Sequence, residues 1–234
     1  MKKKKWLIPI IVMLVLIMIC IGYFAVYYHA SEEVQGYLAG SGAVSVEKDA
    51  QGLFVDGPGE EDALIFYPGA KVEYTAYLPL AYTLAEDGID CFLVQMPLNF
   101  ALLGSGKAGD IMERYKYEQW YLGGHSLGGV AASMYAAGRD LNGLILLASY
   151  PTKGVYAPVL EIYGDQDTVL NMEKRTEADQ YLPKDYEIKV IEGGNHAQFG
   201  NYGEQKGDGE ALISREKQQE ITAEKIGEFV KGRK

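Results

Sequence analysis

Cysteine and histidine are scarce in this chain, which limits the chemistry open to it. Its 234 residues include two cysteines, Cys20 and Cys91, and three histidines. Cys20 lies in an apolar N-terminal run and Cys91 in a segment typical of a buried strand, so we expect neither a disulfide nor a metal site. Basic residues are outnumbered by acidic ones, 22 to 32, and the net charge is −10. Because an acidic domain repels phosphate backbones, we expect no nucleic-acid partner.

The first 28 residues differ in kind from the rest. Lys2 to Lys5 form a basic cluster, and 23 uncharged, mostly apolar residues follow, from Trp6 to Tyr28. As a helix this stretch is about 34 Å long, which is enough to cross a bilayer. Because basic flanks stay in the cytoplasm, we expect a single-pass anchor in the cell membrane and an extracytoplasmic domain after it.

Two other interpretations of this leader stay open. A cleaved signal peptide normally has a shorter apolar stretch and a small-x-small cleavage site, which is missing near Ala30. Lipid modification of Cys20 would follow two bulky residues, Met18 and Ile19. We therefore favour an uncleaved signal-anchor over residues 1–30, a linker over 31–43 and one globular domain over 44–234, which is an ordinary domain size.

The pattern along the globular part predicts an α/β fold. Hydrophobic residues make up 48% of the chain and charged residues 23%, which suits a packed core without repeats or low-complexity tracts. Apolar runs alternate with helical patterns, and strands that are apolar on both faces indicate a parallel sheet covered by helices on both sides. We expect strands within 43–58 (two, around a turn), 62–70, 89–97, 119–126, 141–151, 157–167 and 186–196. We expect helices within 74–88, 109–118 (capped by Asp110), 127–139, 173–183 and 214–232.

Candidate functional loops follow four of these strands. In such a sheet, ligands gather where the carboxyl ends of the strands face outward. The loops there read YPGAK (67–71), GGHSLGG (123–129), YGDQDT (163–168) and GGNHAQFG (193–200). Together they hold a serine, two aspartates and a histidine.

Ser126 lies in the sequence Gly124-His125-Ser126-Leu127-Gly128, which fits the pattern G-x-S-x-G. A glycine-rich turn with a bystander serine would also fit. An apolar strand before it and a small-residue helix after it favour a nucleophile elbow, in which the serine takes a strained conformation. Side chains two positions before and after the serine would collide in such a turn, and glycines occupy both positions here. The N-terminus of the following helix supplies amide donors for an oxyanion.

A serine nucleophile needs a base, and elimination points to His196. His29 lies at the membrane edge, and His125 lies inside the elbow with its side chain expected to point elsewhere. The base in turn needs a carboxylate to orient it. Asp165 and Asp167 are both candidates, and we favour Asp167 because it lies farther past the strand end. The order serine, aspartate, histidine is the order that the α/β-hydrolase fold uses.

With these residues the chain resembles the alpha/beta hydrolases. More narrowly, it is similar to the small, lidless bacterial members of the dienelactone-hydrolase-like group, the alpha/beta-hydrolase fold-5 family. The similarity extends over about residues 44–230 and is carried by IFYPGAKV, GGHSLGG, GDQD and GGNHAQFGNYGEQKGDG. In this family the acid follows a glycine by three positions, which implies Asp167 after Gly164. Dienelactone hydrolases proper use a cysteine nucleophile, so their substrate does not carry over to Ser126.

The resemblance also implies an oxyanion hole and a mode of action. The backbone N–H groups would be those of Leu127 and Ala70, although Pro68 replaces the histidine of the common His-Gly pattern. The short connection over 151–156 leaves no room for a lid, which suggests a small or exposed acyl substrate. We expect a serine esterase without metal or organic cofactor. A peptidase, an acyltransferase or a non-catalytic binding module remain alternatives, whereas GSGKAG (104–109) lacks the context of a dinucleotide site.

Overall fold

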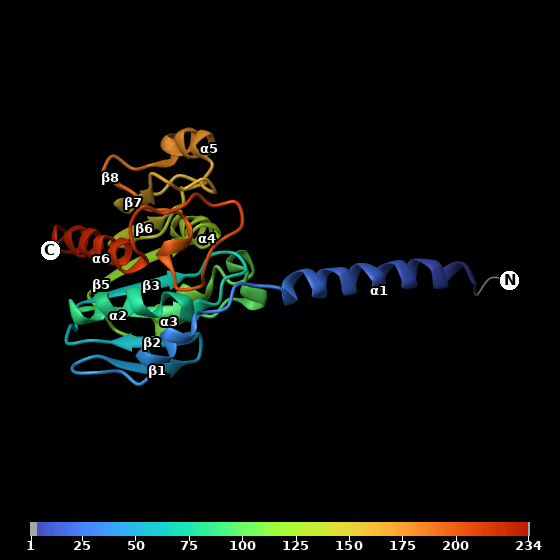
Figure 1. Cartoon of the computed structure of the whole chain (residues 1–234), viewed down its shortest axis with the longest axis horizontal. Coiled ribbons are helices and arrows are strands. Elements are labelled where there is room, and N and C mark those ends of the chain that lie inside the picture. The colour runs from blue at the N-terminus through green and yellow to red at the C-terminus, as the bar shows by residue number, and fades with distance from the viewer. Residues whose placement is uncertain (1–3, 234) are drawn as a thin grey trace.

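The computed structural model describes residues 4–233, apart from the side chains of residues 4–7 and 20. Its centre is an eight-stranded sheet in the order β1-β2-β4-β3-β5-β6-β7-β8 (Figure 1). The first two strands form an antiparallel hairpin, and β2 pairs antiparallel with β4, whereas the other neighbours are parallel. The strands are β1 (Ser45–Asp49), β2 (Gly52–Asp56), β3 (Asp62–Tyr67), β4 (Ile89–Val94), β5 (Gln119–His125), β6 (Gly143–Leu147), β7 (Val159–Gly164) and β8 (Tyr186–Ile191).

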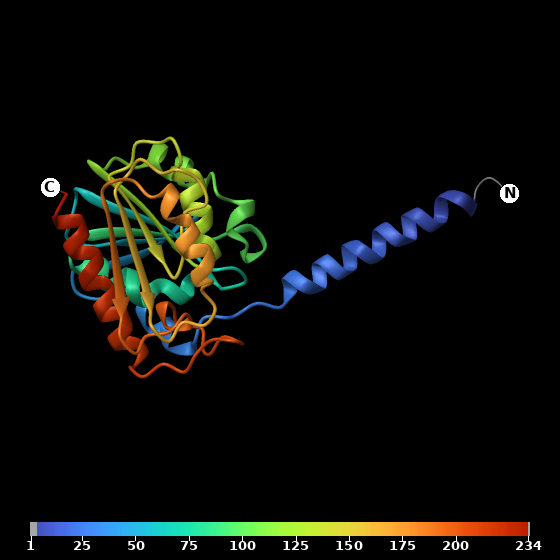
Figure 2. The ribbon, with the colours of Figure 1, turned by 90° about the horizontal axis from the view of Figure 1, so that it is seen from above.

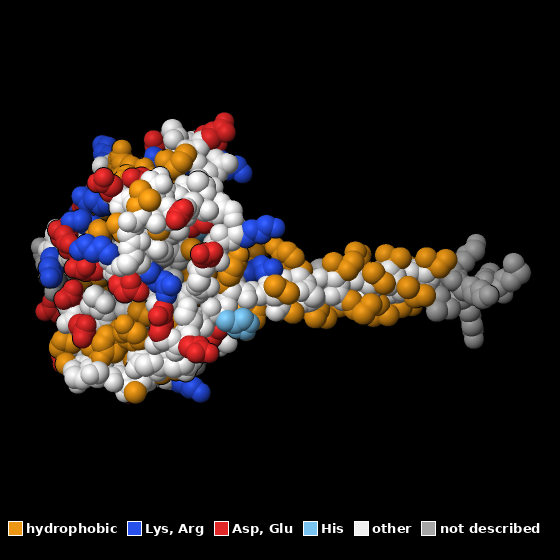
Figure 3. Space-filling view, in the orientation of Figure 1, with side chains coloured by type: hydrophobic (Ala, Val, Ile, Leu, Met, Phe, Trp, Pro, Cys, Tyr) orange, Lys and Arg blue, Asp and Glu red, His pale blue; other side chains and the backbone are white. Residues whose placement is uncertain are grey.

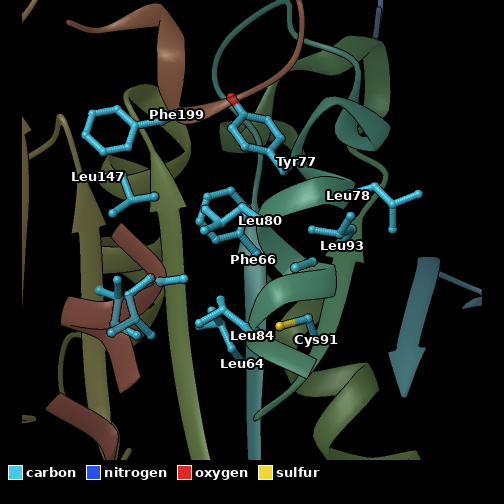
Figure 4. Close-up of a cluster of buried hydrophobic side chains, with 14 of the residues drawn as sticks. Leu64, Phe66, Tyr77, Leu78, Leu80, Leu84, Cys91, Leu93, Leu147 and Phe199 are labelled. Atoms are coloured by element: carbon cyan, nitrogen blue, oxygen red, sulfur yellow. The ribbon is translucent and has the colours of Figure 1, made fainter. Parts of the chain in front are cut away.

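Helices cover both faces of this sheet, so the predicted α/β architecture is confirmed. One core lies under α2 and α6 and includes Leu64 and Phe66 of β3, part of which Figure 4 shows. The other core lies under α3 and α4 and includes the intervening Ala63 and Ile65. Successive side chains of β3 thus enter opposite cores, which is why the strand is apolar throughout. The helices are α2 (Leu78–Glu86), α3 (Lys107–Arg114), α4 (Leu127–Ala136), α5 (Met172–Glu177) and α6 (Arg215–Lys231).

The start of α3 differs from the expectation. The helix begins at Lys107 and is preceded by Gly106, so Asp110 lies in its first turn and does not cap it. The reason is a tertiary contact, because the N–H of Ala108 donates a hydrogen bond of 3.0 Å to the hydroxyl of Tyr67. That contact draws the GSGKAG segment against β3.

The N-terminal helix α1 (Lys4–Ala25) extends away from the sheet (Figure 2). Its 22 residues correspond to about 33 Å, and Ile8–Ala25 is apolar enough to cross a membrane. The residues after it contact the domain. Tyr28 bridges to Val72, Glu33 pairs with Arg215, and Val34 is buried in the short 3-10 helix Glu32–Tyr37.

Candidate active site

Ser126 occupies a sharp turn between β5 and α4. Its φ of 52° and ψ of −124° are strained for a residue with a side chain. The glycines around it are required by close contacts: a Cβ on Gly124 would lie 2.5 Å from the carbonyl carbon of Gly128. A Cβ on Gly128 would lie 2.3 Å from the carbonyl oxygen of Tyr67. The turn therefore has the geometry of a nucleophile elbow, with the serine side chain at the carboxyl ends of the strands.

Asp167 and His196 come together at the same edge, from the loops after β7 and β8. A carboxylate oxygen of Asp167 lies 2.8 Å from Nδ1 of His196, and the two side chains are 1% and 2% exposed. The other carboxylate oxygen accepts the N–H groups of Val169 and Leu170, each at 2.8 Å. Because a carboxylate can only accept, Nδ1 carries the proton and Nε2 is left as the basic nitrogen.

Asp165, the other aspartate of this loop, has a different position. Its side chain is exposed at the turn after β7 and accepts the N–H of Gly193 at 2.7 Å. Asp165 thus ties together the loops that carry Asp167 and His196 without touching the imidazole. Of the two candidates considered from the sequence, the structure brings Asp167 to His196.

Ser126 and His196 border one open depression of about 190 Å³. Within the described part of the chain, neither Oγ of Ser126 nor Nε2 of His196 has a hydrogen-bond partner. In hydrolases this contact is commonly long in the free enzyme and shortens when substrate binds. The remaining wall is mostly apolar, with Leu127, Val130, Ala148, Ser149, Tyr150, Val169, Leu170 and Asn171.

The two backbone amides predicted as oxyanion donors, those of Leu127 and Ala70, have no hydrogen-bond acceptor among the described residues. Leu127 is the first residue of α4, a position whose N–H has no acceptor within its helix. Ala70 lies in the loop after β3, where the N–H groups of its neighbours Gly69 and Lys71 are both engaged. In the residues that the structure covers, no acceptor is found for the N–H of Ala70. The loop touches the elbow at Gly128, so both predicted donors belong to segments in contact.

A buried pair, Tyr77 and His125, supports this loop and was missed from the sequence. The hydroxyl of Tyr77 accepts the N–H of Gly69 at 3.0 Å and lies 2.8 Å from Nδ1 of His125. Figure 4 shows its oxygen directed towards the loops at the strand ends. The ring of His125 lies 4.5 Å from that of His196. Burial, followed by the charge of His196, holds the pKa of His125 well below its usual range, so His125 is neutral.

Only a weak signal for this pair is present in the sequence. The helical spacing of Tyr77 predicts that its side chain faces the core, and the residue is indeed buried. Spacing alone does not reveal which group its hydroxyl bonds to. His125 points away from the depression, as expected, although it lies against His196. Among the described residues, no group of three or more His, Cys, Asp or Glu side chains is arranged to bind a metal.

Comparison with known families agrees with the fold and the turn geometry. The family model described as "Alpha/beta hydrolase family" matches residues 63–220, well over half of the chain. The chain belongs to the alpha/beta hydrolase family. This confirms the resemblance drawn from the four motif segments. A search of curated proteins found no match for this alpha/beta hydrolase.

Solved structures with the same fold include several hydrolases of low sequence identity. A monoacylglycerol lipase from Paleococcus ferrophilus is 15% identical in sequence and has a TM-score of 0.59. The match covers 74% of this chain and 97% of the lipase chain. A dienelactone hydrolase from Anabaena variabilis is 14% identical with a TM-score of 0.57, covering 80% and 97%. A bacterial membrane phospholipase A is 14% identical with a TM-score of 0.58, covering 98% and 99%. At these identities the likeness establishes the fold.

Proposed function

We propose that this alpha/beta hydrolase is a serine hydrolase that cleaves carboxylic esters. The family and the fold support a hydrolase. The observation that carries the finer proposal is the buried 2.8 Å contact between Asp167 and His196, beside the depression that also holds Ser126. A buried carboxylate and imidazole at the mouth of a depression are the means by which such enzymes activate a serine.

In the proposed reaction, Oγ of Ser126 attacks the carbonyl carbon while Nε2 of His196 takes its proton. Asp167 holds the imidazole in the correct tautomer and stabilises its cation. The N–H groups of Leu127 and Ala70 bind the oxyanion of the tetrahedral intermediate. His196 then gives the proton to the leaving alkoxide, and the acyl group stays on Ser126. Water, deprotonated by His196, releases the acid and restores the serine.

An ester suits the site better than the alternatives. The connection over 151–156 is short, and the depression is open, which favours an acyl group presented from an exposed position. Neighbours named as a monoacylglycerol lipase and a phospholipase A support this class. A peptidase or an acyltransferase would use the same residues and would be revealed by amide cleavage or by transfer to an added alcohol.

We also propose that α1 stays attached as a membrane anchor over residues 1–30, followed by the segment 31–43 and an extracytoplasmic domain over 44–234. The apolar stretch of α1 is long enough to span, and Lys2 to Lys5 precede it. A signal sequence near an N-terminus would share these properties, so the size of the mature protein distinguishes the two.

Labelling with a fluorophosphonate probe tests the serine and the anchor together. Cells expressing the full chain should give a labelled band of 25.8 kDa in the membrane fraction, and Ser126→Ala should give none. Ser133→Ala is a matched control, because Ser133 is buried in α4 and bonds to the backbone of Val130. A folded wild type that stays unlabelled would point to a binding module. A labelled band about 3 kDa smaller would indicate cleavage of the leader.

Replacing Tyr77 with phenylalanine tests whether the buried pair positions the oxyanion loop. The change leaves the N–H of Gly69 and Nδ1 of His125 without their partner, at a cost of roughly 1–3 kcal/mol in stability. We expect kcat for a soluble ester to fall about tenfold with little change in KM, since a displaced donor weakens transition-state binding.

The control for this prediction is Tyr82→Phe. Tyr82 lies in α2, which follows directly after Tyr77, and its hydroxyl donates to the carbonyl oxygen of Ser41, away from the depression. We expect that variant to lose some stability and to keep its kcat. Equal kcat losses in the two variants would show that Tyr77 acts only through general stability.

A further inference from the structure

The apolar helix α1 joins the domain at the edge of the sheet where the strands have their carboxyl ends, not at the opposite edge. The chain leaves α1 at Ala25 and pairs at once with the loop after β3. The N–H of Tyr28 donates to the carbonyl oxygen of Lys71 at 2.7 Å, and the N–H of Glu73 donates back to Tyr28 at 2.9 Å. This is the loop that contains Ala70, so the anchor ends a few residues from the oxyanion donors.

Beside this junction the connection after β4, residues 97–104, presents apolar side chains outward. Leu98, Leu102 and Leu103 are 57%, 38% and 56% exposed. In Figures 1 and 2 this green connection lies beside the domain end of α1. Two contacts fix it there: the rings of Phe24 and Phe100 lie 5.6 Å apart, and Leu98 borders an apolar groove against α1. The connection therefore continues the apolar surface of the helix, as Figure 3 also shows.

The backbone of this connection is held in a costly conformation. Leu98 and the next residue, Asn99, both have left-handed φ values, 54° and 52°. A bulky leucine rarely adopts this region of backbone conformation. Strained residues of this kind are found mainly at functional sites, where the surrounding structure holds them in place. Here the strain turns an apolar side chain outward, beside α1. In water an exposed apolar patch would be a liability, but at the end of a membrane span it lies in the interface.

The charge next to the patch suits a lipid surface. The ammonium group of Lys71 lies 4.2 Å from the ring centroid of Tyr23, near the end of α1. Aromatic and basic side chains at the end of a span are typical of the headgroup region, and a cation there attracts anionic lipids. The N–H of Lys71 also donates to the carbonyl oxygen of Asn99 at 2.7 Å. This bond ties the oxyanion loop directly to the exposed connection.

We propose that the catalytic edge of the sheet faces the bilayer, with residues 97–104 inserted among the headgroups, and that the substrate is an acyl ester residing in the membrane. The second part rests on the proposed ester hydrolysis. Ser126 lies at the carboxyl end of β5, on the same edge as Lys71 and the 97–104 connection. An ester carbonyl at headgroup depth would therefore reach the depression without leaving the lipid.

The test uses the full chain reconstituted in phosphatidylcholine vesicles that contain phosphatidylglycerol. Two esters share one leaving group: p-nitrophenyl butyrate dissolved in the buffer and p-nitrophenyl palmitate dissolved in the vesicles. The variant replaces Leu98, Leu102 and Leu103 with serine. We expect its rate on the palmitate to fall at least tenfold and its rate on the butyrate to stay within twofold. Tyr186→Ser is the control, because Tyr186 is 46% exposed at the start of β8, on the opposite edge. We expect it to change neither rate.

An equal loss on both esters, or no loss on either, would overturn the proposal. So would a wild type that cleaves only the butyrate. The placement is also measured without activity, from a fluorophore on Leu102→Cys in a Cys20→Ser background, where the remaining Cys91 is buried. Quenching by brominated lipid supports insertion, and its absence refutes it. A quenched label on a protein that cleaves neither ester would refute the hydrolase and the lipid substrate while supporting the placement.

Discussion

We expect His196→Ala to lower kcat/KM for a short-chain ester by about four orders of magnitude, because the change removes the proposed general base. Asp167→Asn should cost roughly 10³- to 10⁴-fold, because an amide in place of the carboxylate no longer fixes the tautomer of the imidazole. Both effects should fall on kcat, since neither side chain is expected to bind the ground state of the substrate. The measurement is steady-state kinetics with p-nitrophenyl butyrate on purified full-length protein.

Two controls make this result specific. Asp165→Asn changes the other aspartate of the same loop, which bonds to the N–H of Gly193, and it should alter the rate less than about threefold. His196→Ala leaves one oxygen of the buried Asp167 carboxylate without its hydrogen-bond donor, which destabilises the fold by about 1–3 kcal/mol. His196→Gln and a thermal melt of each variant separate that loss from the loss of the base. Equal damage from Asp165→Asn and Asp167→Asn would refute the assignment of the acid.

The strands, their parallel pairing and the elbow could be predicted because short-range patterns indicate them. β3 and β4 are buried at every position, so an apolar run without alternation indicated parallel neighbours. Gly124 is required by backbone contacts within the turn itself, which any chain with this turn must satisfy, whereas Gly128 is required by the neighbouring loop after β3. His196 could be chosen as the candidate base by elimination, because the chain has only three histidines, and the structure places it against Asp167.

The remaining features depend on contacts between segments far apart in the chain. Tyr77 and His125 are 48 positions apart, and no periodicity relates them. The start of α3 is set by the hydroxyl of Tyr67, so the cap expected at Asp110 was wrong. Leu98 violates the local preference for glycine in left-handed backbone, and only its position beside α1 gives that conformation a physical reason. Local rules thus failed mainly where the loops meet the anchor and the depression.

Gly128→Ala should lower both stability and activity strongly, because the elbow and the oxyanion loop touch at this residue. Its Cβ would lie 2.3 Å from the carbonyl oxygen of Tyr67 and 2.4 Å from that of Pro68. These are backbone atoms, so α4 and the loop after β3 must separate, at a cost of about 3 kcal/mol. Since Leu127 and Ala70 lie on the two separated segments, we expect kcat to fall about 100-fold or more.

Gly227→Ala is the matched control for this change, measured by thermal unfolding in detergent and by ester hydrolysis. Gly227 lies in the interior of α6, and no atom would come within 4 Å of an added Cβ. Alanine there should raise the stability by about 0.5–1 kcal/mol, because glycine is a poor helix former, and it should leave kcat unchanged. If the Gly128→Ala protein unfolds at the same temperature as the wild type and hydrolyses the ester at the same rate, the loop after β3 does not press on the elbow. Ala70 would then lose its place as an oxyanion donor, and the second amide would have to come from another segment bordering the depression.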